Sequence, residues 1–333
     1  MSGEELKDYQ LDGEFKNWPR RPDLMTANAL YLFAAMGNML LVAARALFSC
    51  AGMLSAPLNA ALGCVYEAGV LALLPLTVVA NRPGVERAFR LNPPKASAVG
   101  IACALALAAV PLMSDLTTLY RMAIQALGGR ISSLSAGVQW ENLPWMLVFS
   151  AAIPAICEEI MFRGALMGAW ERRGTRYALL VSSAMFAALH GSIEGLPAHF
   201  LMGLVCGTLA INADSLYCAI AFHMTYNGAT LLLSTKQLTE SEIELAARSL
   251  YAYLGGTAGV LLVLLRMGIA LVIFAVLMLA ASSDREKQQR PFEREGKVDR
   301  KKLGWRELVV LLSAVVTVIG LYALDLCGIV GLM

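Results

Sequence analysis

The sequence predicts an all-α polytopic bundle of transmembrane helices, and three observations support this fold class. Of the 333 residues, 58% are hydrophobic and 16% are charged, whereas a soluble domain has roughly 25% charged residues. The mean hydropathy is +0.61. Apolar stretches recur along the chain, and each is close to or above the length that a helix needs to cross about 30 Å of hydrocarbon. We therefore expect eight or nine membrane spans.

Nine apolar stretches account for these expected spans, and the fifth and sixth are the shortest. Residues 114–142 predict something different, an amphipathic helix at the membrane interface followed by a loop rich in glycine and serine. No internal repeat is visible. The expected spans cover residues 27–48, 58–80, 96–113, 143–169, 177–193, 196–212, 215–235, 256–281 and 307–329.

The positive charges are sorted between the two sides of the membrane. With nine spans, 20 of the 27 Lys and Arg residues fall on the side of the N-terminal tail. By the positive-inside rule this side is cytoplasmic, including the basic loop 283–306. The formal net charge is only +2, and no basic face is formed, so we expect membrane lipids as partners and no nucleic acid.

One expected span contains the sequence CEEIMFRGAL, residues 157–166, which places charged groups in hydrocarbon. Such residues are rare and usually face the interior of a helix bundle, where they serve chemistry or transport. Glu159 and Arg163 are four residues apart with the acid first, the better order for an ion pair within a helix. Glu158 points about 100° away around the axis. We therefore expect Glu158 to protonate or to find a polar partner on another helix.

Two short groups in later spans each contain a histidine. They are FAALH, Phe186 to His190, and HMTYN, His223 to Asn227. Counted from the charged residues at the cytoplasmic ends of their spans, Glu158, His190 and Asn227 lie 13 or 14 positions inward, about 20 Å at 1.5 Å per residue. His223 lies one turn shallower. The sequence thus predicts that these four polar residues meet at one level of the bilayer.

A carboxylate, two imidazoles and an amide in a secluded cavity are suited to activating water. A glutamate hydrogen-bonded to a histidine can take a proton from water, while a second histidine and an asparagine stabilise the oxyanion of a tetrahedral intermediate. Glu158, His190 and His223 could instead hold zinc, since two histidines and one glutamate form a catalytic ligand set with an open position for water. No HExxH motif is present, so spacing does not decide between the two.

These three motifs, in this order, resemble those of the CPBP family of intramembrane proteases, which includes CAAX proteases and bacteriocin-processing enzymes and has the patterns EExxxR, FxxxH and HxxxN. The resemblance covers about residues 145–235. It implies that Glu158 and His190 act on water and that His223 and Asn227 form the oxyanion site. Glu159 and Arg163 would support this arrangement. Members of this family have been described both as metalloproteases and as metal-independent glutamate proteases. We favour an enzyme without a cofactor, with Zn²⁺ as the alternative.

With this resemblance, the sequence predicts four parts and three possible functions. A membrane-embedded endopeptidase would cut a prenylated, pheromone-type or bacteriocin-type peptide, or a membrane protein, in a bacterial plasma membrane. An immunity or binding protein of the same fold would not cleave, and a transporter would normally show repeats, which are absent. The parts are a cytoplasmic tail (1–25), N-terminal helices with the interfacial segment (26–142), a catalytic core (143–235) and C-terminal helices (236–333).

Four further residues are expected to have structural roles. Phe186 is interpreted as packing beside the cavity. His199 lies at the start of its span, matches no motif, and is expected to be structural. Glu67 and Arg266 are buried charges in other spans; a position on a substrate path is the alternative to a structural role for both.

Overall fold

The computed structural model describes residues 24–79, 89–129, 131, 138–236, 238–282 and 303–326. This part of the chain is an all-α bundle, as the sequence predicts. Helices are expected in lipid because each backbone N–H and C=O group is satisfied within its own segment. Most of the expected N-terminal tail, the glycine- and serine-rich loop and most of the basic loop 283–306 lie outside the described residues.

Every expected span coincides with a helix or with a run of helical turns. The fourth is the run from Trp140 to Trp170, and the others are single helices. The helices are α2 (Leu24–Cys50), α3 (Ala56–Val79), α5 (Ala96–Ala126), α9 (Thr175–Leu189), α10 (Leu196–Asn212), α11 (Leu216–Leu233), α14 (Gly256–Ser282) and α16 (Trp305–Leu326), with the short helices α12 (Glu240–Arg248) and α13 (Leu250–Tyr253) before α14.

The number of spans stays a prediction. Among the described residues, five segments are long and apolar enough to cross a membrane: Leu24–Cys50, Ala96–Ala126, Trp140–Trp170, Gly256–Ala281 and Trp305–Ala323. Other apolar helices, including α9 and α10, are shorter. The structure also differs from the sequence expectation at residues 114–126, which continue α5 as one helix of 31 residues instead of forming a separate amphipathic helix.

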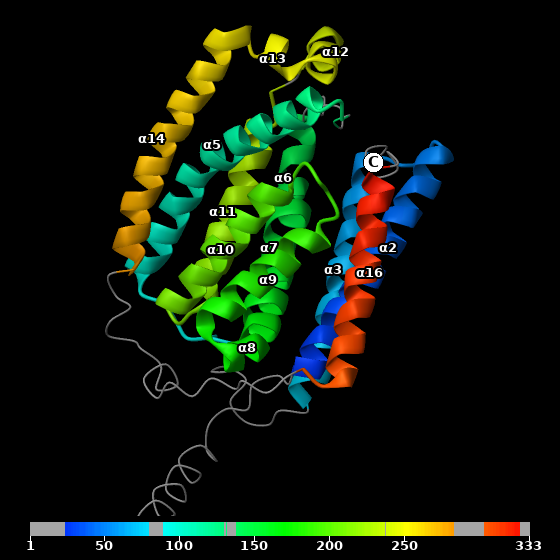
Figure 1. Ribbon diagram of the computed structural model, residues 1–333, viewed down its shortest axis with the longest axis vertical. Helices are drawn as coiled ribbons and strands as arrows, with labels where there is room; N and C mark the ends of the chain where they lie inside the picture. Colours follow the sequence, from blue (N-terminus) through cyan, green and yellow to red (C-terminus); the bar gives the residue numbers. More distant parts are fainter. Residues whose placement is uncertain are drawn as a thin grey trace, which may run out of the picture.

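The helices form a broad bundle with the histidine-bearing helices in its centre (Figure 1). At one end α14 packs on α5, which in turn packs on α11. At the other end α16 packs on α2, and α2 packs on α3. The Trp140–Trp170 run joins the two halves, because its central helix contacts α11 on one side and α3 on the other. Polar side chains on this run are therefore enclosed by helices from both halves.

The Trp140–Trp170 run is a helix interrupted by two wider turns. The regular helix α7 (Ile153–Glu159) has Pro154 in its first turn and lies between the π-helical segments η2 (Leu147–Ala152) and η3 (Ile160–Leu166). The run then ends in α8 (Met167–Trp170). A π-turn adds a residue to the helical repeat and commonly marks a functional position. Here the wider turns flank the two adjacent glutamates.

The segments before α5 and after α8 pack against the Trp140–Trp170 run. Phe89 is buried against Gly164, where a Cβ atom would lie 2.5 Å from its ring. Arg90 is 1% exposed. It forms an ion pair with Glu171 and donates from Nη1 to the backbone oxygen of Arg163 at 3.5 Å. These contacts fix the end of the helix that carries the site.

Candidate active site

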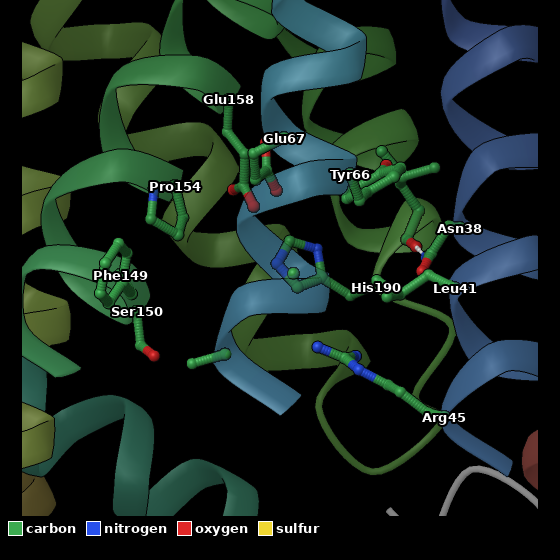
Figure 2. A pocket seen from close by; sticks show the side chains of 13 residues that line it. Asn38, Leu41, Arg45, Tyr66, Glu67, Phe149, Ser150, Pro154, Glu158 and His190 are labelled. Atoms are coloured by element: carbon green, nitrogen blue, oxygen red, sulfur yellow. Dashed lines mark hydrogen bonds between the residues drawn. The ribbon is translucent and has the colours of Figure 1, made fainter. Parts of the chain in front are cut away.

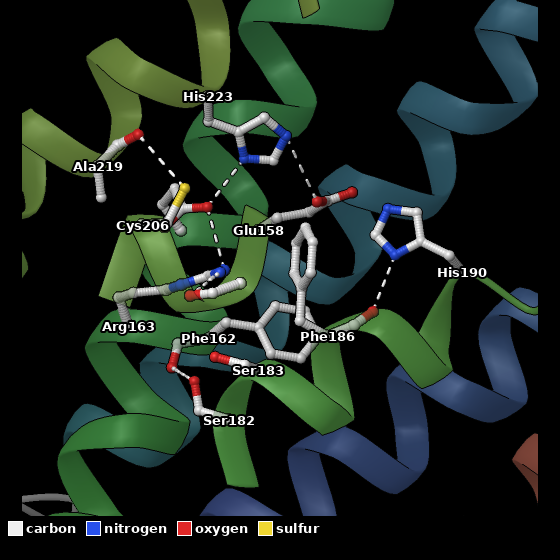
Figure 3. Close-up of polar contacts among 12 residues, drawn as sticks. Glu158, Phe162, Arg163, Ser182, Ser183, Phe186, His190, Cys206, Ala219 and His223 are labelled. Atoms are coloured by element: carbon white, nitrogen blue, oxygen red, sulfur yellow. Dashed lines mark hydrogen bonds and ion pairs between the residues drawn. The ribbon is translucent and has the colours of Figure 1, made fainter. Parts of the chain in front are cut away.

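Glu159 lies at the centre of a fully enclosed polar chain. Its side chain and that of Arg163 are both 0% exposed, and Arg163 Nη1 lies 3.0 Å from Glu159 Oε1, as their spacing predicts. His223 Nδ1, from α11, lies 2.8 Å from the same oxygen. Because the guanidinium pairs with Glu159 as a carboxylate, the imidazole Nδ1–H is the donor in this bond. Glu159 therefore fixes the orientation of the His223 ring. Figure 3 shows the other nitrogen of this ring directed toward Glu158.

Phe186 packs between the charged and the imidazole groups. It is 0% exposed, and the Arg163 guanidinium lies 4.5 Å from its ring centroid. Its ring meets that of His223 at 5.9 Å and that of His190 at 4.7 Å, measured between centroids. Such cation–π and edge contacts stabilise an enclosed guanidinium and restrict ring rotation. The packing role predicted for Phe186 is in agreement with these contacts.

His190 is held in one tautomer by its own helix. It follows the last residue of α9, and its Nδ1 lies 2.8 Å from the backbone oxygen of Phe186. A carbonyl oxygen can only accept, so Nδ1 carries the hydrogen. In the neutral ring the second nitrogen, Nε2, then keeps a lone pair, and the ring faces a cavity. His190 can therefore act as a proton acceptor there.

Two cavities meet at Glu158 and His190. The first, which we call the oxyanion cavity, has a volume of about 350 Å³ and is lined by all four residues expected to meet, including His223 and Asn227. The second, which we call the α2–α3 cavity, has a volume of about 290 Å³ and includes Glu67 in its lining. Both cavities also share Ser150 and Pro154. The border between them thus carries a carboxyl group and an imidazole.

Glu158 is far less tightly held than Glu159. Its side chain is 15% exposed, and its Oε2 lies 3.8 Å from His223 Nε2, too far for a hydrogen bond. The carboxyl group of Glu67, on α3, lies beside that of Glu158 in the lining of the α2–α3 cavity (Figure 2). Two carboxylates cannot donate to each other, so a hydrogen bond between this pair would need a proton on one of them.

His199 also belongs to the oxyanion cavity, although the sequence led us to expect a structural residue near an interface. Its ring stacks on that of His190, with centroids 3.8 Å apart and an angle of 21° between planes. Its Nδ1 is buried and has no hydrogen-bond partner in the described structure. A signal was present in the sequence: His199 is 15 positions from Asp214, nearly the same depth as the other site residues.

Arg266 lies away from both cavities that meet at Glu158. It forms a two-point ion pair with Asp115 of α5, in which Nε donates to Oδ2 at 2.8 Å. The Asp115 side chain is fully buried, whereas that of Arg266 is 60% exposed. This pair joins α5 to α14, and the structural interpretation of Arg266 agrees with it. Glu67 is different, because it faces Glu158.

The positions of Glu158, His190 and His223 meet the requirements of a zinc site only in part. Both imidazoles have Nδ1 occupied and Nε2 available, which is common for zinc ligands. Two nitrogen or oxygen ligands of one zinc ion lie at most about 4 Å apart, because each bond is about 2 Å long. Among the described residues, three ligand atoms gather within 4.8 Å at Glu159, Cys206 and His223 instead. Arg163 already places a positive charge on Glu159 there, so this group does not favour a metal cation.

The fold defines an integral membrane protein with a polar site enclosed by its helices. Residues 140–229 match the family model described as type II CAAX prenyl endopeptidase Rce1-like. The family resemblance predicted from the three motifs is thereby confirmed. All the site residues of those motifs lie within the matched range.

A curated relative is similar over a comparable length. It is "Putative membrane peptidase YdiL" of Bacillus subtilis (strain 168), which is 24% identical over 117 residues. The alignment covers 35% of this chain and 48% of the relative, so the chain spans about half the length of the curated relative that it matches. No solved structure matches the chain.

Proposed function

We propose that the protein is a membrane-embedded endopeptidase that uses a water molecule activated by Glu158. The observation that carries this proposal is the border between the two cavities, where Glu158 and His190 are both accessible. A peptide that passes from one cavity to the other has its backbone beside these two groups. The match to an Rce1-like endopeptidase family supports the same reaction.

Water activation follows from the hydrogen bond that fixes His190. With Nδ1–H donated to Phe186, Nε2 accepts one hydrogen of the water while the Glu158 carboxylate accepts the other. The water oxygen attacks the carbonyl carbon as its proton passes to Glu158, and the carbon–oxygen bond forms. Glu158 then gives this proton to the nitrogen of the departing amine as the carbon–nitrogen bond breaks. The base is regenerated after each cycle.

His223 and Asn227 supply donors for the oxyanion from the other wall. The carboxylate of Glu159 accepts from His223 Nδ1, so the ring presents Nε2 toward Glu158 and the cavity. When both ring nitrogens carry hydrogen, Nε2–H donates to the oxyanion, and the amide group of Asn227 adds a second donor. Fixed donors in an enclosed site are effective because they need little reorganisation as charge develops.

Glu67 is a positioning residue in this mechanism. In this proposal a protonated Glu67 donates a hydrogen bond to the Glu158 carboxylate and holds it at the cavity border, where both residues line the α2–α3 cavity. Glu67 would then be the polar partner that we expected Glu158 to find on another helix. Its donor comes from α3, which lies outside the three motifs.

We propose that this reaction requires no metal ion. If zinc were bound, Glu158, His190 and His223 would hold it, and it would supply a Lewis acid for water and carbonyl. The described side chains do not gather these three ligand atoms as zinc requires, and His223 and Asn227 line the cavity as the proposed donors to the oxyanion. The metal-free proposal rests on these two observations.

The proposed substrate is a membrane-associated peptide, of the prenylated, pheromone or bacteriocin type, or a membrane protein. The sorted positive charges favour a cytoplasmic N-terminus. We propose a bacterial plasma membrane as the location. The bacterial relative supports this choice.

A comparison of peptide termini tests the proposed function. Membranes and medium are collected from cells that express the wild-type chain or Glu158→Gln at matched levels, and new termini are quantified by mass spectrometry. We expect a set of termini to disappear in Glu158→Gln. Glu141→Gln is the matched control, because Glu141 is an exposed residue at the start of the same run, and it should leave the termini unchanged.

The outcome separates cleavage from the non-catalytic alternative. Identical profiles for the wild type and Glu158→Gln would refute proteolysis by this site. If a cellular phenotype were retained at the same time, an immunity or binding protein of the same fold would be the better interpretation. Termini lost in both glutamine variants would point to a general effect on expression.

A further inference from the structure

Arg45 is a charged residue of the α2–α3 cavity, and it has no role in the proposed reaction. It lies near the end of α2 and lines the cavity together with Glu67, Glu158 and His190. In the part of the chain that the structure describes, it makes one weak hydrogen bond, from Nη2 to the backbone oxygen of Asn59 at 3.4 Å. Its Nε is buried and has no partner there. The guanidinium is thus largely unsatisfied.

The carboxyl groups of this cavity are directed elsewhere. Glu67 and Glu158 face each other, and Figure 2 shows them on the opposite side of His190 from Arg45. No ion pair joins Arg45 to a carboxylate among the described residues. A partly buried guanidinium without an anion carries an uncompensated desolvation cost. A carboxylate offers two oxygens that match its fork of donors.

The remaining wall of the cavity is mostly apolar. Leu41, Ala60, Phe149 and Leu189 contribute to it, and Asn38 is occupied by donating to the backbone oxygen of Leu189 at 2.5 Å. Gly63 gives the guanidinium room, since a Cβ atom there would lie 3.2 Å from Nη2. The cavity therefore combines an apolar wall with one unsatisfied cation. These are the features of a subsite for an apolar segment that carries a negative charge.

We propose that Arg45 binds a carboxylate of the substrate on one side of the scissile bond. This inference rests on the proposed function for the position of the scissile bond, between Arg45 in the α2–α3 cavity and Asn227 in the oxyanion cavity. The carboxylate is the free C-terminus of the peptide or the side chain of an acidic residue close to the cut. The protein would thus select among apolar peptides by charge.

Peptide binding to a non-cleaving chain tests this subsite directly. Two dansyl-labelled hexapeptides of alternating leucine and alanine, one with a C-terminal carboxylate and one with a carboxamide, are titrated with the Glu158→Gln protein in detergent micelles. Fluorescence anisotropy gives the dissociation constants. We expect the carboxylate peptide to bind at least ten-fold more tightly. A third peptide, a carboxamide ending in glutamate, distinguishes an acidic side chain from a free C-terminus.

Variants of Arg45 then show whether this residue causes the preference for the carboxylate peptide. Arg45→Met in the same background should reduce the difference between carboxylate and carboxamide to less than two-fold, and Arg45→Lys should retain part of it. Arg248→Met is the matched control, because Arg248 is exposed on α12, and it should keep the ten-fold preference. Size-exclusion profiles check that each variant is folded.

Three outcomes would overturn the proposed subsite. They are equal affinity of both peptides for the chain with Arg45 intact, no binding of either peptide, and a preference that survives in Arg45→Met. The first two need no Arg45 variant, so misfolding cannot conceal them. Since binding is measured without cleavage, a carboxylate preference together with a wild-type chain that cleaves nothing would support the subsite and refute the proposed function.

Discussion

Glu158 and Glu159 are adjacent residues of the same type in the α7–η3 helix, but their surroundings differ. On the enclosed side Glu159 is 0% exposed and is paired with both Arg163 and His223. On the cavity side Glu158 is 15% exposed, and its Oε2 lies 3.8 Å from His223 Nε2. The enclosed side therefore holds the site in place, while the cavity side presents a carboxyl group that borders both cavities.

Because of this difference, we expect Glu159 to position the site and Glu158 to take part in the reaction. Removing one partner from the enclosed chain leaves a charge buried without compensation, so the cost falls on stability. Removing Glu158 leaves no such charge and takes away the proposed proton acceptor. The variants below probe this distinction, beginning with the largest expected effect.

Glu158→Gln and Glu159→Gln should fail in different ways. We expect Glu158→Gln to lower kcat by about 10³-fold or more, because the general base is lost, with little change in melting temperature. Glu159→Gln should lower both kcat and the melting temperature, because Arg163 loses its carboxylate partner. Turnover and thermal unfolding in detergent measure the two effects. Normal turnover by Glu158→Gln would exclude the mechanism.

Arg163→Ala should show the structural cost of the enclosed side. We expect a loss of about 3–5 kcal/mol in the free energy of unfolding, since Glu159 stays buried without its partner. Thermal unfolding and the yield of folded protein provide the measurement. Combining Arg163→Met with Glu159→Gln should recover part of this loss, because neither charge is left alone. A single variant as stable as the wild type would contradict the pairing argument.

Glu67 tests whether the cavity side is organised from a second helix. Glu67→Leu removes the proposed hydrogen bond to Glu158, and a bond to a charged group contributes about 1.5–3 kcal/mol. We therefore expect kcat to fall by about ten-fold or more. Glu67→Gln still offers an N–H donor and should restore most of the rate. Equal rates for the leucine and glutamine variants would show that Glu67 does not act through this bond.

Metal removal should have the smallest effect. We expect elemental analysis of the purified, active protein to find less than one zinc ion per chain, and we expect chelation to leave turnover unchanged. In the proposed mechanism, a carboxylate and fixed donors supply the required chemistry. One zinc per chain that is lost together with activity would reverse this assignment, with Glu158, His190 and His223 as the ligands.

The sequence by itself determined the class of fold, the position of nearly every helix and the central residues of the site. Hydropathy fixes helix positions because hydrocarbon requires long, internally hydrogen-bonded segments. Regular helical rise also placed Glu158, His190, His223 and Asn227 at one depth, and all four line one cavity. The ion pair between Glu159 and Arg163 followed from a spacing of four residues within one helix.

Only the tertiary structure decided which other helices bring residues to the site. Glu67 reaches Glu158 from α3, His199 stacks on His190 from α10, and Arg45 enters the second cavity from α2. Periodicity gives the level of a residue in a helix but not the neighbour that it faces, because that depends on how separate helices pack and rotate. The π-turns on both sides of α7 add to this, since they shift the faces that regular spacing predicts.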